Sequence, residues 1–366
     1  MTEGGGAAPA AAAIPRRAGG GPAVIELAQA GPGRVGPQPL IDRFGRRIDY
    51  LRLSVTDRCD LRCTYCMASR PRFVPRCEVM SLEELERLVS VFLSLGVRRV
   101  RITGGEPLAR AGVLELLERL GRHVRAGTLD ELTLTTNGTR LEAAAAALAR
   151  TGVRRVNVSL DSLDPDVYRR VTRGGDQGAV VRGVDAAVAA GLRVKLNTVV
   201  LGDENRDHVP ALVRWAHARK LELSLIEAMP LGAMGPEHGR RFVSLAELRR
   251  ALSPELTLVP DPRRGPGPAR FFRVGETGGL LGFIAPLSEP FCATCNRVRV
   301  TCTGTLHPCI GSMEGIDLRG PLRTSSSDGE LVDAILEGVS RKPRQHGFRL
   351  GDPGTGVARP MSVTGG

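Results

Sequence analysis

Three cysteines lie close together in the stretch Cys59-Asp-Leu-Arg-Cys63-Thr-Tyr-Cys66. Eight cysteines in a chain of 366 residues do not suggest a disulfide-stapled scaffold, and clustered thiols more often bind metal. A structural zinc ion takes four protein ligands, and Cys77, eleven residues further on, is available as a fourth. A [4Fe–4S] cluster held by three thiolates instead keeps one iron open, which can bind a small molecule through amino and carboxylate groups. The spacing favours the cluster over zinc.

A second group of cysteines, Cys292, Cys295 and Cys309, lies near the C-terminal end. It again offers three thiolates, and Cys302 lies inside the interval. A C-x2-C pair with further cysteines is also a zinc-ribbon layout, so spacing alone leaves zinc and an iron–sulfur cluster both open here. Cys77 and Cys302 are interpreted as bystanders, because free cysteine often packs as a small hydrophobic residue.

The elements that must position these cysteines follow a repeating pattern. Apolar runs bounded by turn residues predict six strands, at 50–55, 97–103, 131–136, 153–160, 192–200 and 221–227. Stretches with helical spacing lie between them, among them a capping box that starts at Ser81 and segments at 140–150, 183–190 and 207–220. Six β/α units in a row imply a parallel sheet with right-handed crossovers, as a barrel or as an open doubly wound sheet.

Unusual polar residues follow the predicted strands. They occupy residues 59–66, 104–107, 135–138, 159–161 and 227–230. Function at the carboxyl ends of all strands is typical of a barrel, whereas an open sheet concentrates function near one switch point. Six units are fewer than the usual eight-unit closure. We therefore predict an α/β fold, a partial TIM-type β/α barrel whose open side is covered by another part of the chain.

Composition divides the chain into three regions. Residues 1–39 are rich in Ala, Gly and Pro and are predicted to be a disordered tail, 40–235 the partial barrel, and 236–366 a C-terminal region that carries the second cysteine group. The segment 261–270 reads as a loop. The tail contains Arg16-Arg17, but the apolar run after it is short and broken by Glu26, which argues against an export signal. No run of about 18 apolar residues spans a membrane, and we predict a cytoplasmic protein.

The net charge is +12, with 51 Lys and Arg against 39 Asp and Glu. Such a balance favours anionic partners such as phosphates, nucleic acid or a membrane surface, or is simply a solvated basic surface. Aromatic residues make up only 4% of the chain, which argues against a nucleic-acid binder that stacks bases. A basic zinc protein that binds nucleic acid remains as the non-enzymatic alternative.

Taken together, these motifs resemble the radical S-adenosylmethionine superfamily and, within it, the GTP 3′,8-cyclase family. The resemblance rests on C-x3-C-x2-C with Tyr65 before its last cysteine, then RITGGEPL, LTTNG, RVNVSLDSLD, VKLNTVV and the terminal Gly-Gly, and it runs from about residue 40 to the end. It implies cyclisation of GTP to (8S)-3′,8-cyclo-7,8-dihydroguanosine 5′-triphosphate, the first step of molybdenum cofactor biosynthesis. A radical enzyme that modifies peptides and carries an auxiliary cluster is the alternative.

The resemblance also implies the cofactors and the chemistry. Two [4Fe–4S] clusters, bound by Cys59, Cys63 and Cys66 and by the second cysteine group, would work with S-adenosylmethionine. An electron from the first cluster would break a C–S bond of that cofactor and release a 5′-deoxyadenosyl radical. The radical would take the 3′ hydrogen of the ribose, and the carbon radical would attack C8 of guanine, which the open iron of the second cluster would hold. The protein must hold the reacting atoms close and exclude water and oxygen.

Individual residues carry roles in the resembling family. Those expected to bind S-adenosylmethionine are Tyr65, Gly105, Ser159, Asn197 and Met229. Those expected to bind GTP are Arg52, Arg101, Thr135, Lys195, Arg297, Val298 and Arg299. Arginine suits a triphosphate through bidentate hydrogen bonds, and an unpaired charge among the apolar neighbours of a strand would be costly. Without the resemblance, Tyr65 and Met229 read as core side chains and Ser159 as a strand end.

Two further positions stand out against the family. Gly365 and Gly366 would ordinarily be a frayed end, but the family's double glycine threads into the active site and promotes catalysis, and glycines pass a narrow path. Ser224 departs from the family's R-F-I-E-x-M pattern, since it stands where the arginine would be. As partners the resemblance implies a homodimer, an electron donor and the next pathway enzyme, cyclic pyranopterin monophosphate synthase, with no nucleic acid and no membrane.

Overall fold

The computed structural model describes residues 1–2, 39–234, 238–263, 265, 267–349, 352 and 355–365. The chain divides into residues 1–36 and 37–366, and every element below belongs to the second unit. The predicted tail therefore lies almost wholly outside the described residues. No helix in the described ranges is long and apolar enough to cross a membrane.

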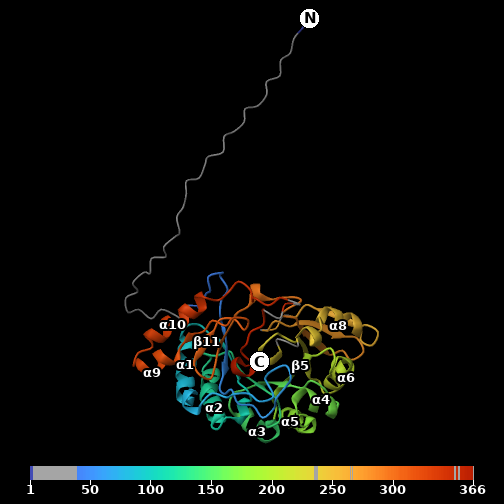
Figure 1. The fold of residues 1–366 in the computed structure, drawn as a ribbon, viewed down its shortest axis with the longest axis horizontal. Helices are drawn as coiled ribbons and strands as arrows, with labels where there is room; N and C mark the ends of the chain where they lie inside the picture. The colour runs from blue at the N-terminus through green and yellow to red at the C-terminus, as the bar shows by residue number, and fades with distance from the viewer. Residues whose placement is uncertain are drawn as a thin grey trace. The chain divides into compact units, whose positions relative to one another are not determined.

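Six strands form the centre of the fold, each inside a predicted range. They are β1 (Tyr50–Ser54), β2 (Arg99–Thr103), β3 (Glu131–Thr136), β4 (Arg155–Ser159), β5 (Arg193–Val200) and β6 (Glu222–Glu227). Each pairs in parallel with the next in chain order, and their helices lie around the outside (Figure 1). The prediction of a six-unit partial barrel is confirmed.

The helices between these strands largely follow their sequence signals. They are α1 (Leu82–Ser94), α2 (Val113–Arg125), α3 (Leu141–Arg150), α4 (Pro165–Thr172), α5 (Gln177–Ala189) and α6 (Val209–Ala218). The capping box of α1 is present: Ser81 Oγ accepts from the backbone N–H of Glu84, whose side chain accepts from that of Ser81. The predicted β/α units imply α2 and α4 but give no bounds for them. Asp164 followed by proline marks the start of α4, where its carboxylate caps two backbone N–H groups.

The C-terminal region extends both edges of the six-stranded sheet with further strands. β10 (Arg297–Val300) pairs in parallel with β1, and β9 (Leu280–Ile284) pairs in parallel with β6. Antiparallel strands extend both edges, so that the order is β12-β11-β10-β1-β2-β3-β4-β5-β6-β9-β8-β7. These outer strands are β7 (Leu258–Asp261), β8 (Arg270–Val274), β11 (Thr305–His307) and β12 (Ile316–Asp317). The predicted loop at 261–270 joins β7 to β8.

Short helices complete the described part of the fold. The α-helices are α7 (His238–Arg241), α8 (Leu245–Leu252), α9 (Arg319–Thr324), α10 (Gly329–Ser340) and α11 (Met361–Thr364). The 3-10 helices are η1 (Arg76–Glu78), η2 (Pro107–Ala109), η3 (Arg206–His208), η4 (Gly232–Met234) and η5 (Cys292–Thr294). The dark red segment that carries α11 runs back into the middle of the molecule (Figure 1).

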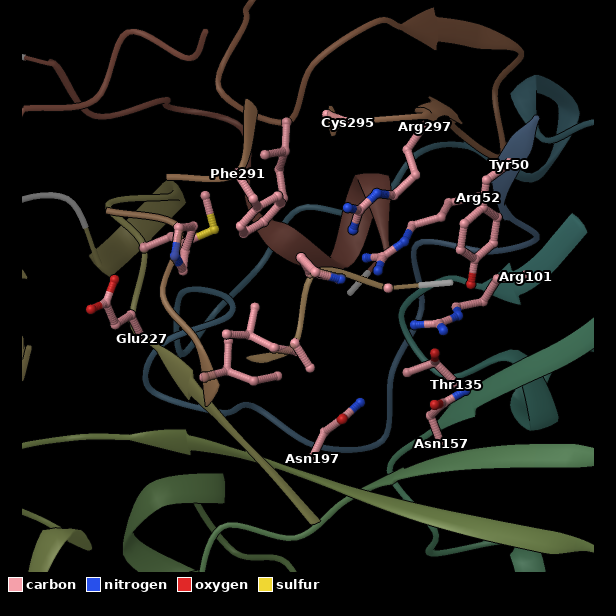
Figure 2. A pocket seen from close by; sticks show the side chains of 18 of the residues that line it. Tyr50, Arg52, Arg101, Thr135, Asn157, Asn197, Glu227, Phe291, Cys295 and Arg297 are labelled. Carbon is pink, nitrogen blue, oxygen red and sulfur yellow. The ribbon is translucent and has the colours of Figure 1, made fainter. Parts of the chain in front are cut away.

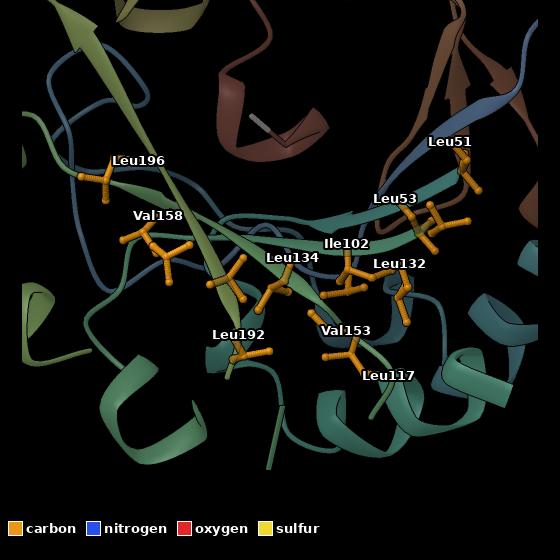
Figure 3. Packing of buried hydrophobic residues seen from close by; sticks show 14 of the residues in the cluster. Leu51, Leu53, Ile102, Leu117, Leu132, Leu134, Val153, Val158, Leu192 and Leu196 are labelled. Carbon is orange, nitrogen blue, oxygen red and sulfur yellow. The ribbon is translucent and has the colours of Figure 1, made fainter. Parts of the chain in front are cut away.

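Alternation along the strands separates two environments. Leu51 and Leu53 of β1 lie in the hydrophobic core (Figure 3). Arg52 between them lines the cavity on the other face of the strand. Ile102 and Leu134 repeat the pattern on β2 and β3. Because successive side chains point to opposite faces, the strands can bury a full apolar layer outside and still present charges inside.

Candidate active site

The barrel encloses a cavity of about 360 Å³. Strands β1 to β6 line one side, and the region around the second cysteine group lines the other (Figure 2). Most of the predicted ligand-binding residues line it: Arg52, Tyr65, Arg101, Thr135, Ser159, Lys195, Asn197, Met229, Arg297 and Arg299. Residues that lie far apart in the sequence are therefore brought to one cavity.

Three arginines stand side by side on one wall of this cavity. Figure 2 shows the guanidinium groups of Arg297, Arg52 and Arg101 reaching into the same space. Among the described residues, none of the three side chains has an ion pair or a hydrogen bond. Arg101 lies over the ring of Tyr50 at 5.5 Å, and Arg297 over that of Phe291 at 5.2 Å. Buried like charges without a counterion are costly, so this wall favours an anionic ligand.

Burial and neighbouring positive charges lower the pKa values of the cations in this cavity. Burial, followed by repulsion from Arg299 and Arg101, lowers the pKa of Arg52 well below its ordinary value. Burial also lowers the pKa of Arg101. Across the cavity, burial lowers the pKa of Lys195 to about 8, although Glu222 acts in the opposite direction. A polyanion bound in the cavity would raise the pKa values of Arg52, Arg101 and Lys195 toward their ordinary values.

The GGEP motif forms backbone hydrogen bonds with the segment that directly precedes the first cysteine group. The backbone N–H of Gly105 donates to Thr56 O at 2.6 Å, and that of Glu106 donates to Arg58 O at 2.7 Å. A Cβ on Gly105 would stand 2.2 Å from the carbonyl oxygen of Arg58, so only glycine fits. Gly105 thus lies behind the cysteine loop. Whether its own carbonyl contacts S-adenosylmethionine stays a prediction.

Glu106 holds the next turn in place from a buried position. Its carboxylate accepts from the backbone N–H groups of Leu108 and Asn137 and from Thr136 Oγ1, at 2.7 to 2.9 Å. Burial raises the pKa of Glu106 to about 7, against those hydrogen bonds. The side chain of Asn137 then reaches Cys59 Sγ at 3.6 Å and Asp60 at 2.7 Å. The β2 and β3 ends therefore position the first cysteine.

The thiols of the first group share a buried site and influence one another. Burial raises the pKa of Cys59 to about 11 and that of Cys66 to about 12. Burial, Asp161 and the other two cysteines raise the pKa of Cys63 well above its ordinary value. Thiolates in such a place need a strong positive partner, which iron ions supply. The three residues thus fit a cluster that they hold together.

Neither cysteine group has the geometry of a single-ion site. In the described part of the chain, no three Cys, His, Asp or Glu side chains stand close enough to hold one metal ion. Zinc would therefore require the thiols to move toward one point, whereas a cubane gives each thiolate its own iron. Cys292, Cys295 and Cys309 all line the cavity. Of the two bystanders, Cys302 is buried as expected, but Cys77 is exposed and does not pack.

Apart from Gly105, the residues expected to bind S-adenosylmethionine line the cavity. Tyr65 donates from its hydroxyl to Asp161 Oδ2 at 2.9 Å, and Asp161 also accepts from the backbone N–H of Val199 at 3.0 Å. Asp161 therefore fixes the Tyr65 ring beside the cysteines. Asn197 points into the cavity (Figure 2). The roles of Tyr65, Ser159, Asn197 and Met229 toward the cofactor remain predictions.

The Arg297-Val298-Arg299 stretch faces two ways. The two arginines line the cavity, but the Val298 side chain is fully buried in the core beneath β10. A contact between Val298 and GTP would therefore have to come from its backbone. Arg299 donates to the carbonyl oxygens of Thr364 and Gly365, so it already holds the C-terminal segment. Gly366 lies outside the described residues.

Several residues that line the cavity were not predicted from the sequence. Arg155 and Asn157 lie on β4, where strict alternation with valine could have marked them as inward-facing. Arg155 forms an ion pair with Glu131 at 2.8 Å, so it is partly neutralised. Lys342 and His346 come from the segment after α10, and no local pattern marks them. Only long-range packing brings that segment to the cavity.

Known proteins match this arrangement along almost the whole chain. Residues 53–216 match the radical SAM superfamily, and residues 221–348 match Molybdenum Cofactor Synthesis C. A GTP 3′,8-cyclase of Caulobacter vibrioides is 54% identical over 93% of this chain and 97% of its own. One of Rhizobium meliloti is 50% identical over 94% of this chain and 99% of its own. The chain belongs to the GTP 3′,8-cyclase family. The match to the superfamily supports a [4Fe–4S] cluster with S-adenosylmethionine at the first cysteine loop.

Solved structures support the fold assignment of this family member. Streptococcus suis SuiB bound to S-adenosylmethionine superposes with a TM-score of 0.58 at 16% identity, over 83% of this chain and 68% of that one. Native anSMEcpe with bound AdoMet gives a TM-score of 0.52 at 18% identity, over 78% and 82%. At these identities the likeness speaks for the fold alone.

Proposed function

We propose that this member of the GTP 3′,8-cyclase family joins C3′ of the ribose of GTP to C8 of its guanine. The product is (8S)-3′,8-cyclo-7,8-dihydroguanosine 5′-triphosphate, the first intermediate of molybdenum cofactor biosynthesis. Relatives that carry this name are 50% and 54% identical over nearly the whole chain. S-adenosylmethionine, bound at the first cluster, supplies the radical that removes the ribose hydrogen.

One observation carries the substrate assignment. Arg52, Arg101 and Arg297 are half-buried in one cavity without a counterion among the described residues, and Lys195 lines the same cavity. A triphosphate supplies several negative oxygens in the planar geometry that guanidinium groups bind. These cations would hold the phosphate end of GTP and leave its ribose and base toward the cysteine groups. If the triphosphate displaces Glu131 from its ion pair with Arg155, Arg155 would also donate to the phosphate oxygens.

The second cysteine group would then hold the base. We propose that Cys292, Cys295 and Cys309 bind a second [4Fe–4S] cluster whose open iron receives guanine. Support comes from three cavity-lining thiols on the wall that also carries Arg297. The strands and the C-terminal region that surround the cavity would exclude water and oxygen from the radical step.

The wider setting is proposed on the resemblance alone. The enzyme would act in the cytoplasm as a homodimer, take electrons from a reductant, and pass its product to cyclic pyranopterin monophosphate synthase. Size-exclusion chromatography with light scattering on the reconstituted protein tests the dimer. A monomer at micromolar concentration would contradict it.

The activity is tested by product identification. The protein is reconstituted anaerobically and incubated with dithionite, S-adenosylmethionine and either GTP or a peptide, and the products are identified by mass spectrometry. We expect 5′-deoxyadenosine together with a new nucleotide that has the mass of GTP and separates from GTP by chromatography. Formation of 5′-deoxyadenosine with GTP but no new nucleotide overturns the assignment, and a modified peptide would favour the peptide-modifying alternative.

Metal analysis tests the cofactors independently of turnover. Two four-iron clusters require about eight irons per chain, and one requires about four. A value near eight is expected, and a value near four removes the second cluster. Zinc in place of iron at both groups would return the protein to the non-enzymatic alternative.

A further inference from the structure

Lys342 is a buried lysine directly behind the second cysteine group. Its side chain is among the largest that the fold buries completely, with 2% of the residue exposed. In the described part of the chain no carboxylate forms an ion pair with it. An ammonium group in such a place is costly unless another negative group compensates it. The groups that the ammonium contacts therefore suggest which negative group compensates its charge.

The ammonium group joins two segments that carry cysteines. Nζ donates to the carbonyl oxygen of Arg297 at 2.7 Å and to that of Pro308 at 2.6 Å. Arg297 follows Cys295 by two residues, and Pro308 directly precedes Cys309. One side chain thus holds both segments at a fixed separation.

The third cysteine is tied to the same segment through Arg46. The Arg46 guanidinium donates to the carbonyl oxygen of Cys292 at 2.8 Å and to those of Pro343 and Arg344 at 2.7 and 3.0 Å. The stretch from Lys342 to Arg344 is therefore connected to all three members of the second group. The first cysteine group has no comparable buried lysine beside it among the described residues.

The second group therefore has two positive side chains, Lys342 and Arg46, hydrogen-bonded to the backbone segments that carry its cysteines. A cluster held by three thiolates is anionic overall, and reduction makes it more so. A fixed cation nearby favours the reduced form.

We propose that Lys342 is a positioning residue for the second cluster: it clamps the two cysteine-bearing segments, and its charge raises the reduction potential of that cluster. The inference rests on the second cluster of the proposed function. Lys342 would act on the cluster through its charge and through its hydrogen bonds to the backbone of Arg297 and Pro308.

The test compares three variants of the full chain. Lys342→Met removes the charge and the donors, and Lys342→Gln removes the charge but keeps an amide donor. Arg341→Met is the matched control, because it removes a positive charge one residue away that is exposed and pairs with Glu337. Each is also made without the first cluster, by Cys59→Ala, Cys63→Ala and Cys66→Ala, so that the remaining cluster is observed alone. Iron content and an EPR-monitored redox titration are the readouts.

We expect the second cluster of Lys342→Gln to titrate at a more negative potential, and Lys342→Met to lose its iron or to shift in the same direction. Arg341→Met should match the parent protein. Unchanged iron and potential in Lys342→Gln overturn the proposal, even if Lys342→Met fails to fold. If the parent without the first cluster binds no iron, the second cluster itself is wrong, and that outcome is distinct because it does not depend on position 342.

Discussion

Arg299 on β10 donates a hydrogen bond to the carbonyl oxygen of Gly365, and so fixes the C-terminal segment inside the barrel. Gly365 has φ of +72°, and a Cβ there would stand 1.7 Å from Thr103 Oγ1. The position therefore requires glycine for both its backbone conformation and its packing. The end of the chain reaches the carboxyl end of β2, next to the GGEP motif.

Deleting Gly365 and Gly366 should leave the fold and both clusters intact and abolish cyclisation. Gly365→Ala should cause a loss of at least tenfold for the steric reason above, since displaced reacting groups lose rate steeply. Gly347→Ala is the matched control, because nothing lies within 4 Å of a Cβ there. Iron content, thermal unfolding and the rate of nucleotide product formation are measured. Normal product formation by the truncated chain contradicts a catalytic role for the tail.

Replacing Arg52 or Arg101 with methionine should have two opposite effects. GTP affinity should fall roughly tenfold or more, because a hydrogen bond to a charged group contributes about 1.5–3 kcal/mol. The ligand-free protein should become more stable, by roughly 1 kcal/mol, since an uncompensated buried charge is removed. Calorimetric titration with GTP and thermal unfolding without it measure both effects.

Arg98→Met is the control for these two variants. Arg98 is at the protein surface and pairs with Asp130 at 2.6 Å. Its loss should leave GTP affinity unchanged and lower stability by about 1 kcal/mol, because Arg98 also donates to the carbonyl oxygens of Gly127 and Thr128. If Arg52→Met and Arg101→Met lower the stability of the ligand-free protein as well as its GTP affinity, the two arginines stabilise the fold, and the proposal that they are there for an anion is wrong.

GTP affinity should depend on pH through Lys195. In the empty cavity burial holds the pKa of Lys195 at about 8, and a triphosphate beside it would raise that pKa again. Binding above pH 8 must then take up a proton, so affinity should fall as pH rises through 8 and beyond. Titration from pH 7 to pH 9.5 checks this. Lys195→Met should bind more weakly at pH 7 and lose the dependence; an equally steep profile in that variant assigns it to another group.

Ser224 occupies a tightly packed position rather than an empty space. It is fully buried on β6, opposite Gly282 on β9, and its hydroxyl has no hydrogen-bond partner in the described structure. Phe271 lies against the same glycine and under the ammonium group of Lys195 at 5.4 Å. The space that an arginine side chain would need is therefore filled.

Ser224→Arg should therefore destabilise the fold by about 1–3 kcal/mol through overpacking and leave GTP affinity unimproved. The double variant Ser224→Arg with Phe271→Ala makes room for the new side chain. Stability and GTP affinity are measured for both proteins. If Ser224→Arg alone binds GTP more tightly than the parent protein, the new arginine reaches the phosphates and the native site lacks a donor.

The fold and much of the site follow from local patterns. Alternation and turn residues located six strands, the capping box at Ser81 located α1, and cysteine spacing picked out the two candidate cluster sites. These signals are readable because each depends on neighbouring residues, through strand periodicity or helix capping. The family resemblance then selected cavity residues such as Arg52 and Arg101.

The tertiary structure alone decided how the barrel is completed and which charges face one another. Nothing local in 297–300 or 280–284 marks these segments as parallel partners of β1 and β6, since such pairing joins residues far apart in the chain. The same packing placed the Val298 side chain in the core and brought Lys342 behind the second cysteine group. Within the described ranges it also left Arg52 without a counterion. The sequence by itself determined the chemical groups and the strands that carry them; only their contacts in space determined which groups share one cavity.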